Sequence, residues 1–235
     1  MKAKRPDTGQ TREDLRRRRS HRTREALGTA AVELVLEHGL DGFGVEAIVE
    51  RAQVTRRTFS RYFPGKEDAA LDFTRADGAR INDALRRRPA DEPPLAAYRA
   101  AVLDWLDDDE HPAGHGRPKE RAVLALVDRE PDLLAAYARI RAEAQAASVR
   151  VLADRLGVDP ARDPRPGLVV EVGAGVLSSV LHAWARETEG DAAELAARVA
   201  HAYDLLGHEV AAATDHMHHS GPRTADPGAR KGARQ

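Results

Sequence analysis

Three arginines lie within a six-residue stretch of this chain, at Arg56, Arg57 and Arg61, followed closely by Tyr62 and Lys66. A guanidinium group can donate two parallel hydrogen bonds to O6 and N7 of one guanine, which distinguishes that base in the major groove. The same group can bind backbone phosphates, which adds affinity without sequence information. A single arginine could equally be a solvated surface charge. Three together on one short segment favour a contact surface for nucleic acid.

The segment that contains these arginines is predicted to be the second helix of a helix-turn-helix. The spacing of apolar residues predicts a helix over Val45–Ala52, a turn at residues 53–55 and a second helix over Arg56–Phe63. Thr55 is placed to cap the second helix by accepting a hydrogen bond from a backbone amide. Once the apolar side chains are assigned to the core, the outer face keeps the polar residues expected of a recognition helix: Arg56, Arg57, Ser60 and Arg61.

The run VEAIVERAQVTRRTFSRYFPGKEDAAL resembles the helix-turn-helix signature of TetR-family regulators, and the resemblance covers about residues 20–75. The match is specific because the apolar spacing, the aromatic pair, the Pro-Gly break and the Lys-Glu-Asp run occur together. The resemblance implies that Phe59 and Phe63 are core residues. It also implies DNA contacts, and with Ser60 from the outer face the predicted DNA-binding residues are Thr55, Arg56, Arg57, Ser60, Arg61, Tyr62 and Lys66.

Three positions depart from the family pattern. The turn has Gln53 where glycine is common, so a left-handed backbone there would be strained. Gly44 replaces the threonine or serine that caps the first of the two helices and touches phosphate. Ser60 replaces a tyrosine in the middle of the recognition helix. These changes shift the expected DNA contacts toward arginine.

The charge of the chain is distributed unevenly along its 235 residues, although the net charge is only −1. Residues 1–66 carry 15 Lys/Arg against 9 Asp/Glu, whereas residues 67–220 carry 18 against 28. A basic unit joined to an acidic body suits an anionic polymer bound at one end, although a solvated arginine-rich arm would give the same totals. The chain has no cysteine, which excludes disulfides and thiol catalysis.

The predicted fold class is all-α, because alanine, leucine, glutamate and arginine dominate and alternating strand patterns are absent. An N-terminal three-helix DNA-binding domain over residues 20–66 is expected to follow a disordered basic arm at residues 1–19. A C-terminal helical bundle for ligand sensing and dimerisation would span residues 67–214, before a disordered tail at residues 215–235. Beyond the two short helices above, helices are expected over residues 20–38, 66–88, 95–106, 118–129, 131–156, 167–187 and 191–214.

The last two predicted helices carry more apolar surface than one solvated helix would expose. The family resemblance implies that they pair with the same helices of a second chain in a four-helix bundle, although packing within one chain would also explain the pattern. The predicted dimer interface consists of Gly173, Gly175, Leu177, Leu181, Val199 and Tyr203.

A ligand pocket is expected among the middle helices, where ALVDREPDLLAAYARIRAEAQ resembles the sensor domains of actinobacterial members. Few charged residues interrupt the apolar faces there, which favours an apolar or amphipathic small effector. Many of these residues would be plain core even if a pocket exists. The candidates are Leu103, Leu106, Leu124, Val127, Tyr137, Ile140 and Trp184.

These features predict a cytoplasmic transcriptional repressor that binds a palindromic operator in double-stranded DNA as a homodimer and is released by a small, largely apolar effector. No phosphate loop, nucleophile elbow or HExxH motif supports an enzyme, and neither a cofactor nor a metal site is expected. The histidines of residues 216–219 are interpreted as incidental. A helical adaptor that binds only proteins would leave the arginine-bearing helix unexplained. No run of eighteen apolar residues suggests a membrane span.

Overall fold

The computed structural model describes residues 8–108, 110, 112–187 and 190–219, and these residues form helices without any strand. The predicted all-α fold class is confirmed. In chain order the elements are α1 (Thr8–His38), the 3₁₀ turn η1 (Leu40–Gly42), α2 (Val45–Arg51), α3 (Arg56–Tyr62), α4 (Lys66–Ala70), α5 (Asp72–Arg87), α6 (Pro94–Leu106), the 3₁₀ turn η2 (Gly114–Gly116), α7 (Pro118–Leu126), α8 (Pro131–Leu156), α9 (Arg165–Ala185) and α10 (Ala192–His219).

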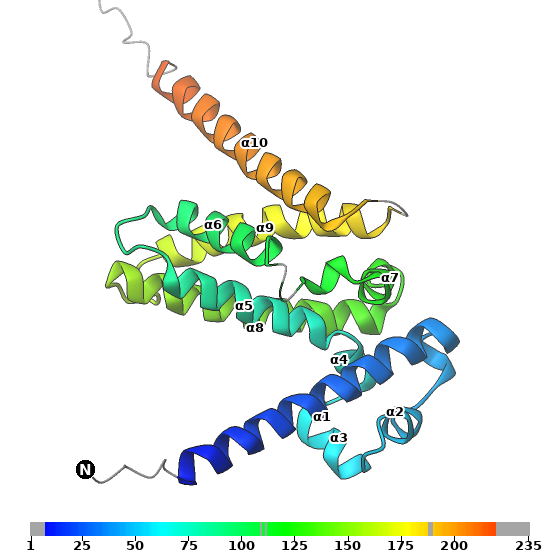
Figure 1. Ribbon diagram of the computed structural model, residues 1–235. Coiled ribbons are helices and arrows are strands. Elements are labelled where there is room, and N and C mark those ends of the chain that lie inside the picture. The colour runs from blue at the N-terminus through cyan, green and yellow to red at the C-terminus, as the bar shows by residue number, and fades with distance from the viewer. Residues whose placement is uncertain (1–7, 109, 111, 188–189, 220–235) are drawn as a thin grey trace, which may run out of the picture.

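Helices α1 to α4 form a small head at one end of the molecule, below the body formed by α5 to α10 (Figure 1). The apolar face of α1 packs against α2 and α4, and Leu27, Ile48 and Phe59 are almost completely buried in the core that these helices share with α3. The same apolar core continues into the body, where it includes Leu124 of α7 and Leu133 of α8. Head and body therefore share one core and are not joined by the chain alone.

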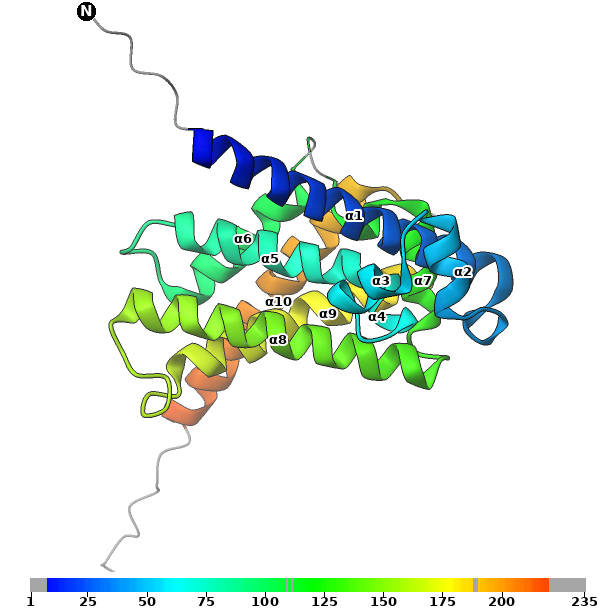
Figure 2. The same ribbon diagram turned by 90° about the horizontal axis from the view of Figure 1, so that it is seen from below.

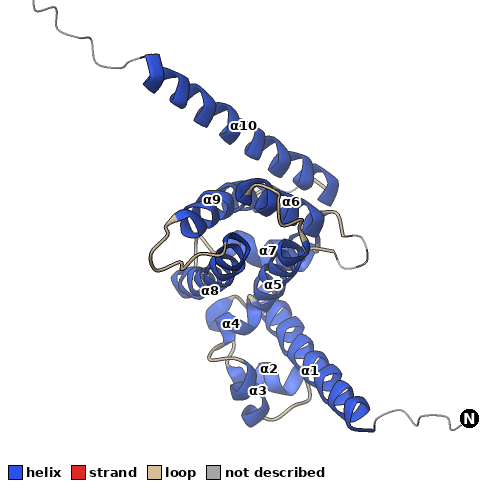
Figure 3. Ribbon diagram, turned by 90° about the vertical axis from the view of Figure 1, so that its left-hand side faces the viewer, coloured by secondary structure: helices blue, strands red, loops and turns tan. Residues whose placement is uncertain are grey.

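The body is a stack of helices in which α5 and α8 lie next to the head, α6 and α9 lie above them, and α10 crosses over the top (Figure 3). The view from below shows the head, α1 to α4, in front of the body (Figure 2). A second apolar core fills the space between α5, α6, α8, α9 and the first half of α10. Helices α5 and α8 approach closely at Gly78, where an added Cβ would lie 2.9 Å from Cβ of Ala144.

Both ends of the described chain are more helical than the sequence predicted. Helix α1 begins at Thr8, so residues 8–19 are not the disordered arm that was expected; residues 1–7 lie outside the described residues. This stretch lacks proline and consists mainly of helix-forming residues. A Glu13–Arg17 ion pair of 2.7 Å, one turn apart, also supports it. At the other end, α10 continues to His219, past the predicted boundary at residue 214, and residues 220–235 are not described.

Helix α9 is the one helix in the described part of the chain that is long and apolar enough to pass as a membrane span by length and composition. Its buried residues Val170, Ala174, Leu181 and Trp184 pack into the second core of the body. The same length and composition are found in core helices of soluble proteins, so they are weak evidence for a membrane span.

Candidate DNA-binding helix and ligand cavity

Helix α3 presents its arginines to solvent because its other face is anchored in the head. Phe59 is buried, and Phe63, just past the end of the helix, is buried beside it with ring centroids 5.7 Å apart. The hydroxyl of Thr55 accepts a hydrogen bond from the amide of Thr58 at 3.2 Å, so Thr55 caps the helix as the sequence predicted. The residues that remain exposed are Arg56, Arg57, Ser60 and Arg61.

The exposed arginines of α3 differ in what they contact. Arg56 forms an ion pair with Glu46 of α2. Arg61 donates a hydrogen bond to the hydroxyl of Tyr62 at 2.9 Å and lies over its ring. Arg57 forms no hydrogen bond or ion pair with any residue that the structure describes, so its donors are available to a ligand.

Tyr62 connects the end of α3 to the N-terminal half of α1. Its hydroxyl lies 2.9 Å from the hydroxyl of Ser20, and this hydrogen bond, together with the nearby Arg61, lowers the pKa of Tyr62. The contact holds the exposed basic stretch Arg16–Arg19 of α1 beside the recognition helix. The sequence did not identify Ser20, because its spacing from Tyr62 has meaning only once α1 is known to extend this far.

Lys66 is used inside the head, although the family resemblance implies a DNA contact for it. Its Nζ donates hydrogen bonds to the backbone carbonyls of Leu40 at 2.6 Å and Phe43 at 3.2 Å, and it lies over the Phe43 ring. These contacts fix the loop that precedes α2 to the start of α4. We therefore assign Lys66 a positioning role in the head.

The two departures in the turn and at the first cap have the structural consequences that were expected. Gln53 has φ of 53°, which makes it the one residue other than glycine with positive φ in the described part of the chain. Gly44 stands at the N-cap of α2 and provides no side-chain hydrogen bond. The backbone of the turn follows the left-handed conformation even though glycine, which adopts it without strain, is absent.

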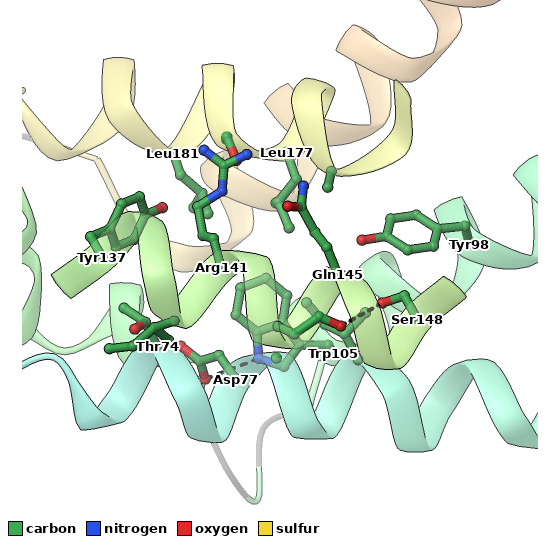
Figure 4. A pocket seen from close by; sticks show the side chains of 16 residues that line it. Thr74, Asp77, Tyr98, Trp105, Tyr137, Arg141, Gln145, Ser148, Leu177 and Leu181 are labelled. Atoms are coloured by element: carbon green, nitrogen blue, oxygen red, sulfur yellow. Dashed lines mark hydrogen bonds between the residues drawn. The ribbon is translucent and has the colours of Figure 1, made fainter. Parts of the chain in front are cut away.

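A cavity of about 80 Å³ lies within the body between α5, α6, α8 and α9 (Figure 4). Tyr137 and Tyr98 lie at opposite ends of the cavity, with Trp105 between them. Burial raises the pKa of Tyr98 to about 12, so its hydroxyl stays protonated at neutral pH. The complete lining consists of Thr74, Asp77, Gly78, Ile81, Tyr98, Trp105, Tyr137, Ile140, Arg141, Ala144, Gln145, Ser148, Ala174, Leu177, Ser178 and Leu181.

Of the seven residues predicted to line a pocket, the structure places Tyr137 and Ile140 in the cavity wall. The other five pack into the two apolar cores and do not line this cavity. The physical reason is that helical periodicity identifies a buried face without separating solid core from cavity wall. The five residues are Leu103, Leu106, Leu124, Val127 and Trp184.

The predicted dimer interface is mostly occupied within one chain. Tyr203 of α10 donates a hydrogen bond from its hydroxyl to the carbonyl of Gly173 at 2.8 Å, and a Cβ on Gly173 would lie 2.5 Å from the Tyr98 ring. Five of the six predicted residues are buried by helices of the same chain, because the chain covers most of this apolar face itself. These are Gly173, Leu177, Leu181, Val199 and Tyr203; Gly175 alone of the six predicted residues is exposed.

A different face of α9 remains apolar and exposed. Leu168 is 61% exposed and Val172 is 41% exposed, and both share one helical stripe with Gly175, where an added Cβ would meet no atom within 4 Å. On α10, Leu205 and Val210 are about half exposed, at 49% and 57%. An exposed apolar stripe on α9, next to exposed apolar side chains on the adjacent α10, is typical of an interface surface.

The cavity is connected to the head through Asp77 of α5. Its carboxylate accepts hydrogen bonds from the Trp105 indole at 3.1 Å and from the amide of Gly114 at 3.0 Å, which fixes the η2 turn at the start of α7. Helix α7 packs on α1, and Lys119 of α7 forms an ion pair of 2.6 Å with Glu33 of α1. A route of direct contacts therefore runs from the cavity wall to the head beside the covalent route through α4 and α5.

The junction between head and body is held by charged pairs around Asp68 of α4. This carboxylate is buried and accepts hydrogen bonds from Arg139 of α8 and from Arg75 of α5. Arg24 of α1 donates bonds of 2.6 to 3.0 Å to the Asp72 carboxylate, which raises the pKa of that guanidinium. Helices α1, α4, α5 and α8 are thus tied together at one point.

Comparison with known proteins agrees with this geometry. Residues 28–70 match the family described as bacterial regulatory proteins of the tetR family, and residues 92–211 match the MftR C-terminal domain. The chain is 37% identical over 199 residues to the HTH-type transcriptional regulator TcmR of Streptomyces glaucescens, which covers 83% of this chain and 88% of that protein.

Among solved structures, the fatty acid degradation regulator FadR from Bacillus halodurans is similar in fold, with a TM-score of 0.50. The similarity covers 78% of this chain and 94% of that chain at 18% identity. The two family matches and the TcmR relative identify a DNA-binding transcriptional regulator and not an enzyme. The chain therefore belongs to the TetR family of bacterial regulatory proteins.

Proposed function

We propose that this protein is a homodimeric repressor that binds a palindromic operator through α3 and is released when a small effector enters the cavity between α5, α6, α8 and α9. The single observation that supports the DNA-binding part most strongly is the exposed, partner-free guanidinium of Arg57 on a short helix anchored by Phe59. A recognition helix with this arrangement places arginine donors against base edges in the major groove.

The exposed apolar stripe on α9 and the exposed apolar side chains of α10 support binding as a dimer. Two copies that cover Leu168 and Val172 against each other would remove a surface that a single chain leaves in water. An isologous pair of this kind presents two identical recognition helices related by a two-fold axis, which matches two inverted half-sites in the operator.

The N-terminal half of α1 would extend each contact beyond the half-site. Arg16, Arg18 and Arg19 are exposed, and the Ser20–Tyr62 contact holds them beside α3. Arginines placed there can bind phosphates that flank the bases read by α3, and such contacts add affinity that falls as salt is raised.

Effector control requires that the cavity and the head respond to each other. The contacts from Asp77 through η2 and α7 to α1, and the charged pairs around Asp68, give two physical links between them. An effector that binds better to the conformation unsuited to DNA shifts the population toward that conformation, and a coupling of about 1–3 kcal/mol is sufficient for a switch.

Selection of bound sequences from a pool of random duplex DNA tests this proposal. We expect enrichment of one sequence with two inverted half-sites whose centres lie about one helical turn apart. The protein should bind this duplex as a dimer, and an effector should lower DNA affinity by the same factor by which DNA lowers effector affinity. Enrichment of a single unrepeated half-site, or effector affinity unchanged by saturating operator, would contradict the proposal.

A further inference from the structure

We infer that the cavity binds a flat, largely apolar ligand that carries one acidic group, and that Arg141 with Gln145 receives this group. This inference rests on the proposed function, because it specifies the chemistry of the effector that the cavity would accept. It adds one acidic group to the small, largely apolar effector that the sequence predicted.

The polar residues of the cavity fall into two groups according to whether they already have partners. Asp77 accepts hydrogen bonds from Trp105 and Gly114, and Ser148 donates to Asn82 at 2.8 Å. These groups are satisfied by the protein itself. Buried polar groups that already have partners stabilise the fold and leave little capacity for a ligand.

Arg141 and Gln145 belong to the second group. They lie one turn apart on α8, both half-buried, and both point from α8 toward α9 (Figure 4). Neither forms a hydrogen bond or ion pair with a residue in the described ranges, and the nearest recorded contact of the Arg141 guanidinium is the Tyr137 ring, 5.9 Å away. A guanidinium that lines a cavity without a carboxylate beside it lacks a counterion, and a ligand could provide one.

The carboxylate of Asp77 also lines the cavity, so a basic ligand group at Asp77 is the alternative to an acidic group at Arg141. Asp77 belongs to α5 and its oxygens already receive donors, whereas Arg141 belongs to α8 and its donors have no acceptor. An acidic group placed at Arg141 gains charge-assisted hydrogen bonds. A basic group placed at Asp77 would share a carboxylate that already accepts hydrogen bonds from Trp105 and Gly114. Because the Asp77 carboxylate already accepts hydrogen bonds and the Arg141 guanidinium has no acceptor among the described residues, an acidic ligand group is favoured over a basic one.

The shape and lining of the cavity define the rest of the ligand. Tyr137 and Tyr98 lie at the two ends and Trp105 lies between them, while Ile81, Leu177 and other aliphatic residues complete the wall. Aromatic side chains around a narrow space favour a flat ring system, which they contact by stacked or edge-to-face packing. The ligand class is therefore a flat ring system that bears a carboxylate or an equally acidic group.

Calorimetric titration of the full-length protein with 2-naphthoate and with the neutral 2-naphthamide tests the inference. The two probes have the same ring system and differ in charge. We expect naphthoate to bind at least roughly tenfold more tightly, as a charge-assisted hydrogen-bond pair allows. Arg141→Met should remove this preference while leaving naphthamide affinity unchanged. Arg150→Met, an exposed position on the same helix, should leave both affinities unchanged.

Equal binding of the two probes to the wild-type protein, or no binding of either, overturns the inference. So does a preference for naphthoate that survives in a folded Arg141→Met variant. If that variant does not fold, the comparison of naphthoate and naphthamide affinity for the wild-type protein still tests whether the cavity prefers an acidic ligand. Operator binding is measured in the same samples: Arg141-dependent binding of naphthoate that leaves operator affinity unchanged would refute the effector role and leave the ligand class standing.

Discussion

The double substitution Val172→Arg and Gly175→Arg should convert the protein to monomers. Operator binding should weaken by at least about 100-fold, because the two half-sites would no longer be bound in one event. Both positions lie on the exposed stripe of α9, and an added Cβ at Gly175 meets no atom within 4 Å. The two substitutions therefore place four charges across the two-fold axis without disturbing the core of either chain, and unpaired charges at the centre of an interface are strongly unfavourable.

Analytical ultracentrifugation and operator titration of the same samples measure this prediction. Ala146→Arg, an exposed position on α8, is the matched control and should remain a dimer with unchanged affinity. Circular dichroism establishes whether the double variant is folded. A folded double variant that sediments as a dimer would place the interface on another surface. A wild-type protein that is monomeric at micromolar concentration would contradict the proposed homodimer.

Replacing Arg139 with methionine should lower the free energy of unfolding by about 3 kcal/mol, because the partly exposed guanidinium stabilises a buried carboxylate. The Asp68 side chain is only 6% exposed and would keep Arg75, 3.5 Å away, as its remaining partner. Urea denaturation of the variant, the wild-type protein and Arg150→Met measures the difference. A loss below about 1 kcal/mol, as is typical of surface pairs, would show that this pair is solvated and contributes little.

The elements of the head were predictable because their signals are local. The Val45 and Arg56 starts of α2 and α3, the Thr55 cap and the buried Phe59 and Phe63 all follow from residues within a few turns of one another. The Ser20–Tyr62 contact was not predictable in this way, since it joins residues 42 positions apart on helices whose packing only the fold establishes.

The cavity was harder to predict because a cavity is defined by what does not fill it. Sequence periodicity selected large apolar residues such as Leu124 and Val127, which pack as solid core. A usable signal was nevertheless present on α8, where Tyr137, Arg141 and Gln145 recur at intervals of four and interrupt an otherwise buried face with polar groups. Polar residues on the inner face of a core helix are unusual and mark a binding site better than apolar ones.

The sequence did not separate the face of α9 that packs inside the chain from the face that stays exposed. Apolar residues surround α9 almost completely, and the sequence alone does not say which side α6, α8 and α10 cover. The structure shows that Leu177 and Leu181 face the cavity and that Leu168 and Val172 face outward.

The most direct test of the proposed function is a titration of wild-type protein and Arg57→Ala against the selected operator and a scrambled duplex of the same composition. If Arg57 reads a base, the substitution should cost about 1–3 kcal/mol on the operator and much less on the scrambled duplex. The exposed control Arg150→Ala should change neither affinity. An equal loss on both duplexes would show that Arg57 contacts phosphate only, and no loss on either would contradict recognition of the operator by this face of α3.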